Sequence, residues 1–209
     1  MSSTETAVQA ATEALGTRIR RVVTGHDASG KAVIVSDGPA PFVHTNPLRP
    51  GYASTDIWRT HAMPAPIEAT PKDTTADGPR RQLPTRNGTV LRINTLAPEP
   101  ESVRKLGAQE AQLVFSQGGN AGASTFAANH RHPMMHRTET VDYAVILSGE
   151  VTMLLDDSEV NLKTGDVVVQ VGTNHAWVNR SDAPCQILFA MFDGAFEPEL
   201  KAVLGSDGH

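Results

Sequence analysis

The last third of the chain alternates between short apolar runs and turn residues. The segment DYAVILSGEVTMLLDD (142–157) is rich in β-branched and aliphatic residues and is interrupted by Gly149 and Glu150, which predicts a hairpin or a tight strand pair. A short strand EVNLK follows, then a turn at 164–166, then the apolar run VVVQV, which Gly172 closes. Many short strands in quick succession are typical of a sandwich or a barrel.

The upstream part of the chain also predicts strands separated by turns. The runs RIRRVVTG, KAVIVSDG, ASTDIWRTHAM and TVLRINTL have strand-like composition, and Pro-rich or polar connections lie between them. Residues 98–129 have the composition of an insertion, in which SVRKLGAQEA predicts one or two helical turns and QGGNAGASTFAAN predicts a flexible loop. Such a loop could serve as a lid or be a plain surface insertion.

The length predicts one domain with embellishments. The chain has 209 residues and no internal repeat, so a single well-buried core accounts for it. We expect a flexible or helical N-terminal arm (1–17), a β extension with an inserted loop (18–131), a motif-bearing region of the same domain (132–195) and a C-terminal helix or tail (196–209).

Strand periodicity indicates which side chains share a face. Residues two apart on a strand point the same way, so His175 and Trp177 should lie together. In the segment DYAVILS both faces are apolar, since Tyr143 and Leu147 alternate with Ala144, as expected of a strand covered on both sides. The cover would be the N-terminal strands, a partner subunit or both. We expect a homodimer, because symmetric dimers are the commonest soluble oligomers.

Composition and charge exclude several classes of function. The single cysteine, Cys185, cannot form an internal disulfide, which agrees with a reducing cytoplasm. The net charge is -5 and the largest basic cluster is Arg18, Arg20 and Arg21, so we expect no nucleic-acid partner. Since the sequence lacks an apolar run of about eighteen residues and its N-terminus lacks a secretory leader, we expect a cytoplasmic protein without a membrane partner.

The segment from 165 to 179 resembles a motif of a known superfamily. Its order of glycine, small insert, glycine, histidine and asparagine is carried by Gly165, Asp166, Gly172, His175 and Asn179, while Gln170 stands where a proline is usual. This order is similar to the second motif of the cupins. The resemblance implies an all-β fold, a double-stranded β-helix or jelly-roll barrel, to which this sequence adds N-terminal strands and minor helices.

The first cupin motif departs further from the family pattern, which is His-x-His, three or four residues, an acid, six residues and a glycine. Counting back from Gly149 places Asp142 at the acidic position and His136 and Thr138 at the two histidine positions. The resemblance implies a divalent metal ion held by His136, Asp142 and His175, with Fe(II) or zinc preferred over manganese or nickel. Because Thr138 is a neutral and poor ligand, we expect weaker metal binding than in a four-ligand cupin, or a water where the second histidine would stand.

Two imidazoles and one carboxylate resemble the facial triad of non-haem iron(II) sites, and catalytic zinc uses a similar trio with a bound water. A strand rises about 3.3 Å per residue, so an extended chain would hold His136 and Asp142 about 20 Å apart. Residues 138–140 must therefore bend for the two side chains to share an ion. Asp142 could equally cap a turn or pair with Arg137, and a single histidine is often structural.

Further residues near the motifs are candidates for binding and proton transfer. The expected pocket residues are Thr138, Gln170 and Trp177, and the proton-transfer candidates are Glu139, His130 and His132. Although His130 and His132 form a His-x-His, their spacing to Glu139 does not fit the family pattern, and Pro133 favours an extended loop there.

The resemblance implies a metal-dependent enzyme that acts on a small oxygen-bearing organic molecule. It leaves dioxygenase, decarboxylase, isomerase and lyase chemistry open, because a fold does not select a reaction. The alternative is a metal-free cupin that binds a small molecule for sensing or storage, which the threonine at position 138 favours. Metal content distinguishes the two.

Overall fold

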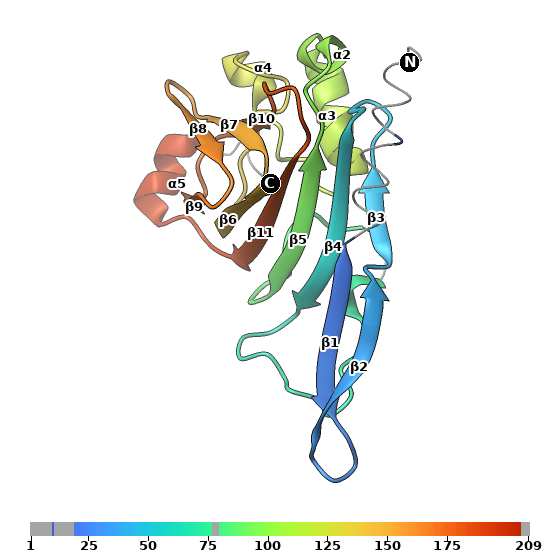
Figure 1. The fold of residues 1–209 in the computed structure, drawn as a ribbon. Coiled ribbons are helices and arrows are strands. Elements are labelled where there is room, and N and C mark those ends of the chain that lie inside the picture. The colour runs from blue at the N-terminus through green and yellow to red at the C-terminus, as the bar shows by residue number, and fades with distance from the viewer. Residues whose placement is uncertain (1–9, 11–18, 77–79, 206–209) are drawn as a thin grey trace.

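The structure is a computed structural model that describes residue 10 and residues 19–76 and 80–205. Within these residues a main sheet of six strands has the order β3 (Phe42–Thr45), β4 (Tyr52–Thr60), β5 (Thr89–Leu96), β11 (Cys185–Asp193), β6 (Thr140–Ser148), β9 (Val167–Val171). A smaller sheet has the order β10 (Ala176–Val178), β7 (Glu150–Leu154), β8 (Glu159–Lys163). Strands β1 (Arg20–His26) and β2 (Ala32–Pro39) form a hairpin that extends beyond the main sheet (Figure 1).

The chain crosses repeatedly between the two larger sheets, as in a jelly roll. It leaves the main sheet after β6, enters the small sheet at β7, and returns to the main sheet at β9. Gly149 lies at the first crossing with φ 75°, and a Cβ there would lie 2.6 Å from the carbonyl oxygen of Pro184. The predicted hairpin at this glycine is wrong, because β6 pairs with β11 and β9 whereas β7 pairs with β10 and β8. The all-β jelly-roll prediction is confirmed.

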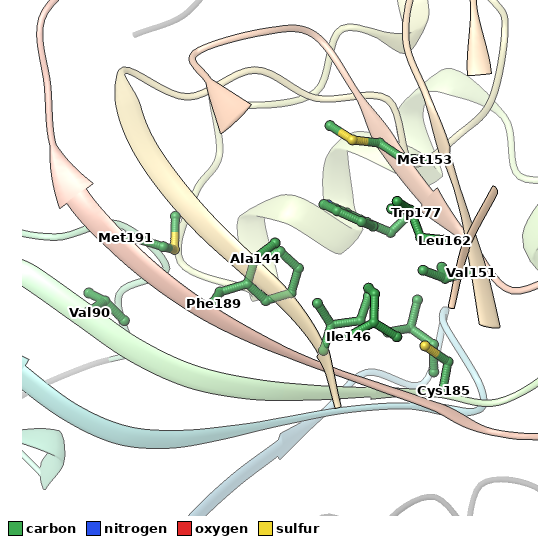
Figure 2. Close-up of a cluster of buried hydrophobic side chains, with 12 residues drawn as sticks. Val90, Ala144, Ile146, Val151, Met153, Leu162, Trp177, Cys185, Phe189 and Met191 are labelled. Carbon is green, nitrogen blue, oxygen red and sulfur yellow. The ribbon is translucent and has the colours of Figure 1, made fainter. Parts of the chain in front are cut away.

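The core lies between the two sheets, and on β6 and β11 alternate residues point into it. On β11 every second residue is buried, from Cys185 to Met191. The main sheet contributes Ala144, Ile146, Ile187 and Phe189, and the small sheet contributes Val151, Met153, Leu162 and Trp177 (Figure 2). Period-two burial gives β6 and β11 one core face each, whereas β7 and β10 are buried on both faces, since their other side chains belong to a second cluster.

The segment between β5 and β6 is more helical than the sequence predicts. It contains α2 (Glu101–Arg104), α3 (Ala108–Gln117) and α4 (Phe126–Asn129), which gather at one end of the barrel (Figure 1). A second cluster of buried residues joins these helices to the small sheet and consists of Val103, Leu106, Ala111, Val114, Met134, Met135, Leu154, Ala176 and Val178. This end of the barrel is therefore closed by packed helices. Two short elements, η1 (Thr74–Ala76) and α5 (Pro198–Leu204), complete the described helices.

The outer face of β6 remains exposed in the single chain. Tyr143 is 47% exposed and Leu147 is 40% exposed, and the neighbouring strand β9 exposes three valines, Val167, Val169 and Val171. Strand β5 lies beside β11 in the main sheet and β4 lies beside β5, so these strands extend the sheet and do not cover this face. The homodimer stays a prediction. The predicted N-terminal arm lies outside the described residues except for residue 10, and the structure holds no described helix able to span a membrane.

Candidate functional site

Two histidines lie side by side where the chain enters the two sheets. His136 precedes β6 and His175 precedes β10, and their backbones form an antiparallel bridge with N–H···O distances of 2.9 Å in both directions. Their ring centroids are 4.3 Å apart. This bridge brings together two residues that are 39 positions apart in the sequence.

Each of these rings is oriented by a backbone carbonyl. Nδ1 of His136 lies 3.0 Å from the carbonyl oxygen of Met134, and Nδ1 of His175 lies 2.9 Å from that of Thr173. Because a carbonyl oxygen only accepts, Nδ1 of each ring donates, and this places the lone pair on Nε2. Histidines that bind metal ions are held in this way, and so are histidines that accept a proton.

Burial keeps both imidazoles neutral at pH 7. It lowers the pKa of His175 to about 4. Burial and the neighbouring His175 lower the pKa of His136 well below its usual value. A neutral ring is the form that binds a metal ion or accepts a proton. The pair is therefore available for either role at neutral pH.

Asp142 lies in the wall of the same cavity, on the inward face of β6. Its Oδ1 is buried and lacks a hydrogen-bond partner among the described residues. Burial raises the pKa of this carboxyl to about 6, although a hydrogen bond from Thr140 and the charge of Arg92 oppose the shift. Asp142 therefore changes its protonation state close to neutral pH.

The three residues expected to bind a metal ion line one cavity, but they do not converge. The residues that the structure describes contain no group of three His, Cys, Asp or Glu side chains able to hold a metal ion. The two histidines meet at an isolated bridge, whereas Asp142 is the third residue of β6 and pairs with Gln170 of β9. A metal ion held by all three does not fit this arrangement, and only the two imidazoles are adjacent donors.

The cavity combines an apolar wall with a polar one. Its volume is about 50 Å³, and since a single water needs roughly 10–15 Å³ on this measure, it admits a few waters or a small molecule. The apolar lining is Leu96, Phe115, Met134, Trp177, Phe189 and Met191. The polar lining is Arg49, Tyr52, Gln82, Arg92, Asn94, His136, Asp142 and His175.

Several lining residues come from parts of the chain that the sequence motifs do not reach. Arg92 and Asn94 lie on β5, and Phe115 lies on α3. The run TVLRINTL contained a signal for the first two, since Arg92 and Asn94 are two and four residues after the apolar Val90 and so share its face. Nothing comparable marked Phe115, whose position depends on how α3 packs.

The three expected pocket residues have different places. Trp177 lines the cavity and packs edge-on against His175 and Phe189, with ring centroids 6.0 and 5.4 Å apart. Gln170 lies behind the cavity, where its Nε2 donates to the Thr173 carbonyl at 3.0 Å and so braces the loop that orients His175. Thr138 is also outside the lining, and its hydroxyl shares a hydrogen bond of 2.8 Å with Thr140.

The expected proton-transfer residues lie elsewhere. Both ring nitrogens of His132 are engaged, Nε2 with Glu99 at 3.1 Å and Nδ1 with the Met134 N–H at 3.1 Å. His130 is exposed and has a left-handed backbone conformation. Glu139 accepts from the Lys201 ammonium at 3.4 Å, towards α5. None of the three belongs to the described lining of the cavity, so Asp142 replaces them as the titratable neighbour of the histidine pair.

The depressed pKa of His175 predicts sensitivity to acid. The native state binds fewer protons than the unfolded state between the usual pKa of 6.5 and the folded pKa of about 4, so stability is complete above pH 6.5 and falls as pH decreases through that window. Asp142 has the opposite effect on stability: its pKa is raised to about 6, so the native state binds its proton more readily and this residue favours folding as pH decreases. We expect the free energy of unfolding, measured with urea in the presence of chelator, to fall between pH 7 and pH 4 by roughly 3 kcal/mol less in His175→Gln than in the wild type. An equal fall in the free energy of unfolding of the two proteins would contradict the prediction that His175 causes the acid sensitivity.

Comparisons with known proteins agree with the fold. Residues 122–191 match the family model described as Cupin domain, and this range contains both histidines and Asp142. Phomopsin biosynthesis cluster protein D of Diaporthe leptostromiformis is 46% identical over 69 residues, which cover 32% of this chain and 36% of that protein. Cupin-domain-containing oxidoreductase fogC of Aspergillus ruber is 26% identical over 180 residues, which cover 84% of this chain and 73% of that protein.

The matches to the first curated relatives are partial, since they span 36%, 26% and 28% of those proteins. Among solved structures, a Cupin 2 conserved barrel domain protein from Salinispora arenicola is similar with a TM-score of 0.36 and 13% identity. That similarity covers 71% of this chain and 82% of the other.

Proposed function

This chain belongs to the cupin superfamily, and we propose that it is an oxidoreductase that acts on a small oxygen-bearing organic molecule bound in the cavity between its sheets. The observation that carries the proposal is the pair of adjacent, neutral imidazoles, of half-buried His136 and buried His175, whose Nδ1 atoms are both held by backbone carbonyls. The similarity to fogC, which is named an oxidoreductase, supports this class of reaction.

We further propose that His136 and His175 bind a divalent metal ion through Nε2, with Fe(II) or zinc preferred over manganese or nickel. Imidazole nitrogen suits each of these metals, and the orientation of both rings by carbonyl groups supports a ligand role. A bound metal would polarise a substrate oxygen or support oxygen chemistry. Asp142 is then a neighbouring acid or base and not a ligand, because it does not converge with the two rings.

The protein's own groups would prepare the substrate in three ways. Trp177, Phe115 and Phe189 form an apolar wall that excludes water from the reacting atoms. Asp142, whose pKa is raised to about 6, can accept or release a proton near neutral pH. The histidine pair offers lone pairs on a rigid backbone bridge, which fixes their positions relative to the substrate.

A metal-free ligand-binding protein is the second candidate. It is favoured by the lack of a three-ligand group among the described residues and by the small, partly cationic cavity. The two candidates differ in what chelator does: a metal-dependent enzyme loses turnover, whereas a metal-free binder keeps its ligand affinity.

Elemental analysis of the protein purified without chelator tests the metal proposal. We expect near-stoichiometric Fe, Zn, Mn or Ni in the wild type, reduced about tenfold or more in His136→Ala and in His175→Ala, because each variant removes one of two adjacent donors. His130→Ala is the matched control, since this histidine is exposed and outside the cavity, and it should keep its metal. Absence of metal from the wild type after anaerobic reconstitution would favour the metal-free candidate.

A further inference from the structure

One wall of the cavity carries polar atoms that the fold leaves unsatisfied. Arg92 is only 2% exposed, and its Nε has no hydrogen-bond partner among the described residues, although one Nη donates to the Gln82 carbonyl. Two positions along β5, the side-chain oxygen of Asn94 is also buried without a described partner. A buried polar atom without a partner costs free energy, so such atoms in one cavity indicate a ligand that would satisfy them.

A second guanidinium lies at the same wall. The guanidinium carbon of Arg49 is 4.3 Å from the centre of the Tyr52 ring, and both residues line the cavity with Arg92. Burial alone would raise the pKa of Tyr52, but the charges of Arg80, Arg49 and Arg92 together lower it. The phenol therefore lies in a positively charged environment.

The positive charge exceeds the buried negative charge nearby. Burial lowers the pKa of Arg92 to about 10, so this side chain is still a cation at pH 7. The carboxylate of Asp56, opposite Arg92 in the register of β4 and β5, is shared with Arg59 and His44. Two further carboxyl groups act on this wall, since Asp142 lies near Arg92 and Glu99 lies near Arg49. Among the described residues the four guanidinium groups of Arg49, Arg59, Arg80 and Arg92 still outnumber these three carboxyl groups, which leaves the wall able to accept an anion.

We propose that this wall binds a carboxylate of the substrate, to which Arg92 and Arg49 donate, with Tyr52 beside it. The side-chain oxygen of Asn94 only accepts, so it would pair with a donor group of the substrate and not with the carboxylate. Guanidinium groups match a carboxylate in charge and in planar geometry, and their hydrogen bonds to it strengthen where water is excluded. The rest of the substrate would contact the aromatic side chains of Phe115, Phe189 and Trp177. The inference rests on the proposed function, because it names the substrate class of the same cavity: a small organic acid.

A titration with matched acids and amides tests this inference in the full chain. The protein has two tryptophans, so a Trp58→Phe background makes Trp177, in the cavity wall, the single tryptophan reporter. Acetate and benzoate are compared with acetamide and benzamide, which have similar shapes and no charge. We expect the acids to bind about tenfold or more tightly than the amides, as measured by Trp177 fluorescence and by the shift in Tm.

Variants of Arg49 identify the wall as the origin of that preference. Arg49 lies in the turn before β4, so its replacement should leave the fold intact, as Tm of the free protein will show. Arg49→Gln should remove most of the preference for acids, and Arg49→Lys should keep part of it. Arg104→Gln, on the exposed side of α2, makes the same charge change outside the cavity and should keep all of it. Equal affinity for acids and amides, or a preference unchanged in Arg49→Gln, would overturn the inference.

This titration is independent of turnover. A preference for acids in a protein that converts no substrate would contradict the enzyme proposal and leave the carboxylate site in place. Conversion of neutral molecules together with equal binding of acids and amides would contradict the carboxylate site alone.

Discussion

Replacing Asp56 with alanine is expected to lower the free energy of unfolding by about 3–5 kcal/mol, since removal of one partner leaves buried charges uncompensated. Asp56 is 2% exposed, and its Oδ2 lies 3.3 Å from Arg59 and 3.4 Å from His44. Burial would raise the pKa of Asp56, yet the hydrogen bond from His44 and the charges of Arg92 and Arg59 lower it to about 2. The Asp56 carboxylate, which is outside the cavity lining, therefore stabilises the buried guanidinium groups by compensating their charge.

Urea unfolding at pH 7 measures this effect, and Asp37→Ala supplies the control. Asp37 forms an ion pair of 2.6 Å with Arg20 on the β1–β2 hairpin, but both side chains are exposed. Exposed pairs contribute little to stability, so Asp37→Ala should leave the unfolding midpoint almost unchanged. Similar midpoints for the two variants would show that the Asp56 carboxylate is not required to balance the buried guanidinium groups.

The fold could be predicted because its strands have strong period-two patterns and its second motif is well preserved. The order of glycine, histidine and asparagine between 165 and 179 indicated a jelly roll, and the structure has one. The pairing of the strands was harder to predict from the sequence. A glycine such as Gly149 serves a hairpin and a crossing between sheets equally well, because both need a positive φ, and local sequence does not indicate which strand lies beside β6.

The candidate site was predicted where it lies within the motifs and missed where it depends on distant strands. His136, Asp142, His175 and Trp177 line one cavity; the resemblance to the cupin motifs implied the first three, and strand periodicity indicated that Trp177 lies with His175. The described residues hold no group of three metal-ligating side chains, so the metal site stays a prediction. The cationic wall is formed by β5, which pairs with β11, and by the turn before β4, which pairs with β5, and both pairings join distant parts of the sequence.

The two walls of the cavity have different proposed roles: the histidine pair carries out the reaction, and the cationic wall binds the substrate. The histidine pair comes from the motif-bearing region that matches the Cupin domain, at 122–191. Arg49 and Arg92 come from strands and turns upstream of that match. A chain with the same motifs and different upstream strands would keep the reactive pair and bind a different substrate. Substrate choice would then be encoded separately from the reaction, as expected where one fold supports many functions.

His175→Gln is expected to lower turnover about 10²–10⁴-fold, because the amide neither accepts a proton at neutral pH nor replaces the imidazole nitrogen as a ligand. The assay follows conversion of a panel of small hydroxy and keto acids, and of their neutral amides, by mass spectrometry in air. His132→Gln is the matched control, since that histidine is also buried but pairs with Glu99 outside the cavity lining. It should keep most of its turnover.

Each result has a distinct reading in this comparison. Loss in His175→Gln alone, with its fold and benzoate affinity retained, would place the chemistry at the histidine pair and separate it from binding at the cationic wall. Equal turnover in the wild type and in His175→Gln would contradict the proposed reactive centre. Equal losses in His175→Gln and His132→Gln would mean that the buried histidines act through the stability of the barrel, since only one of them faces the cavity.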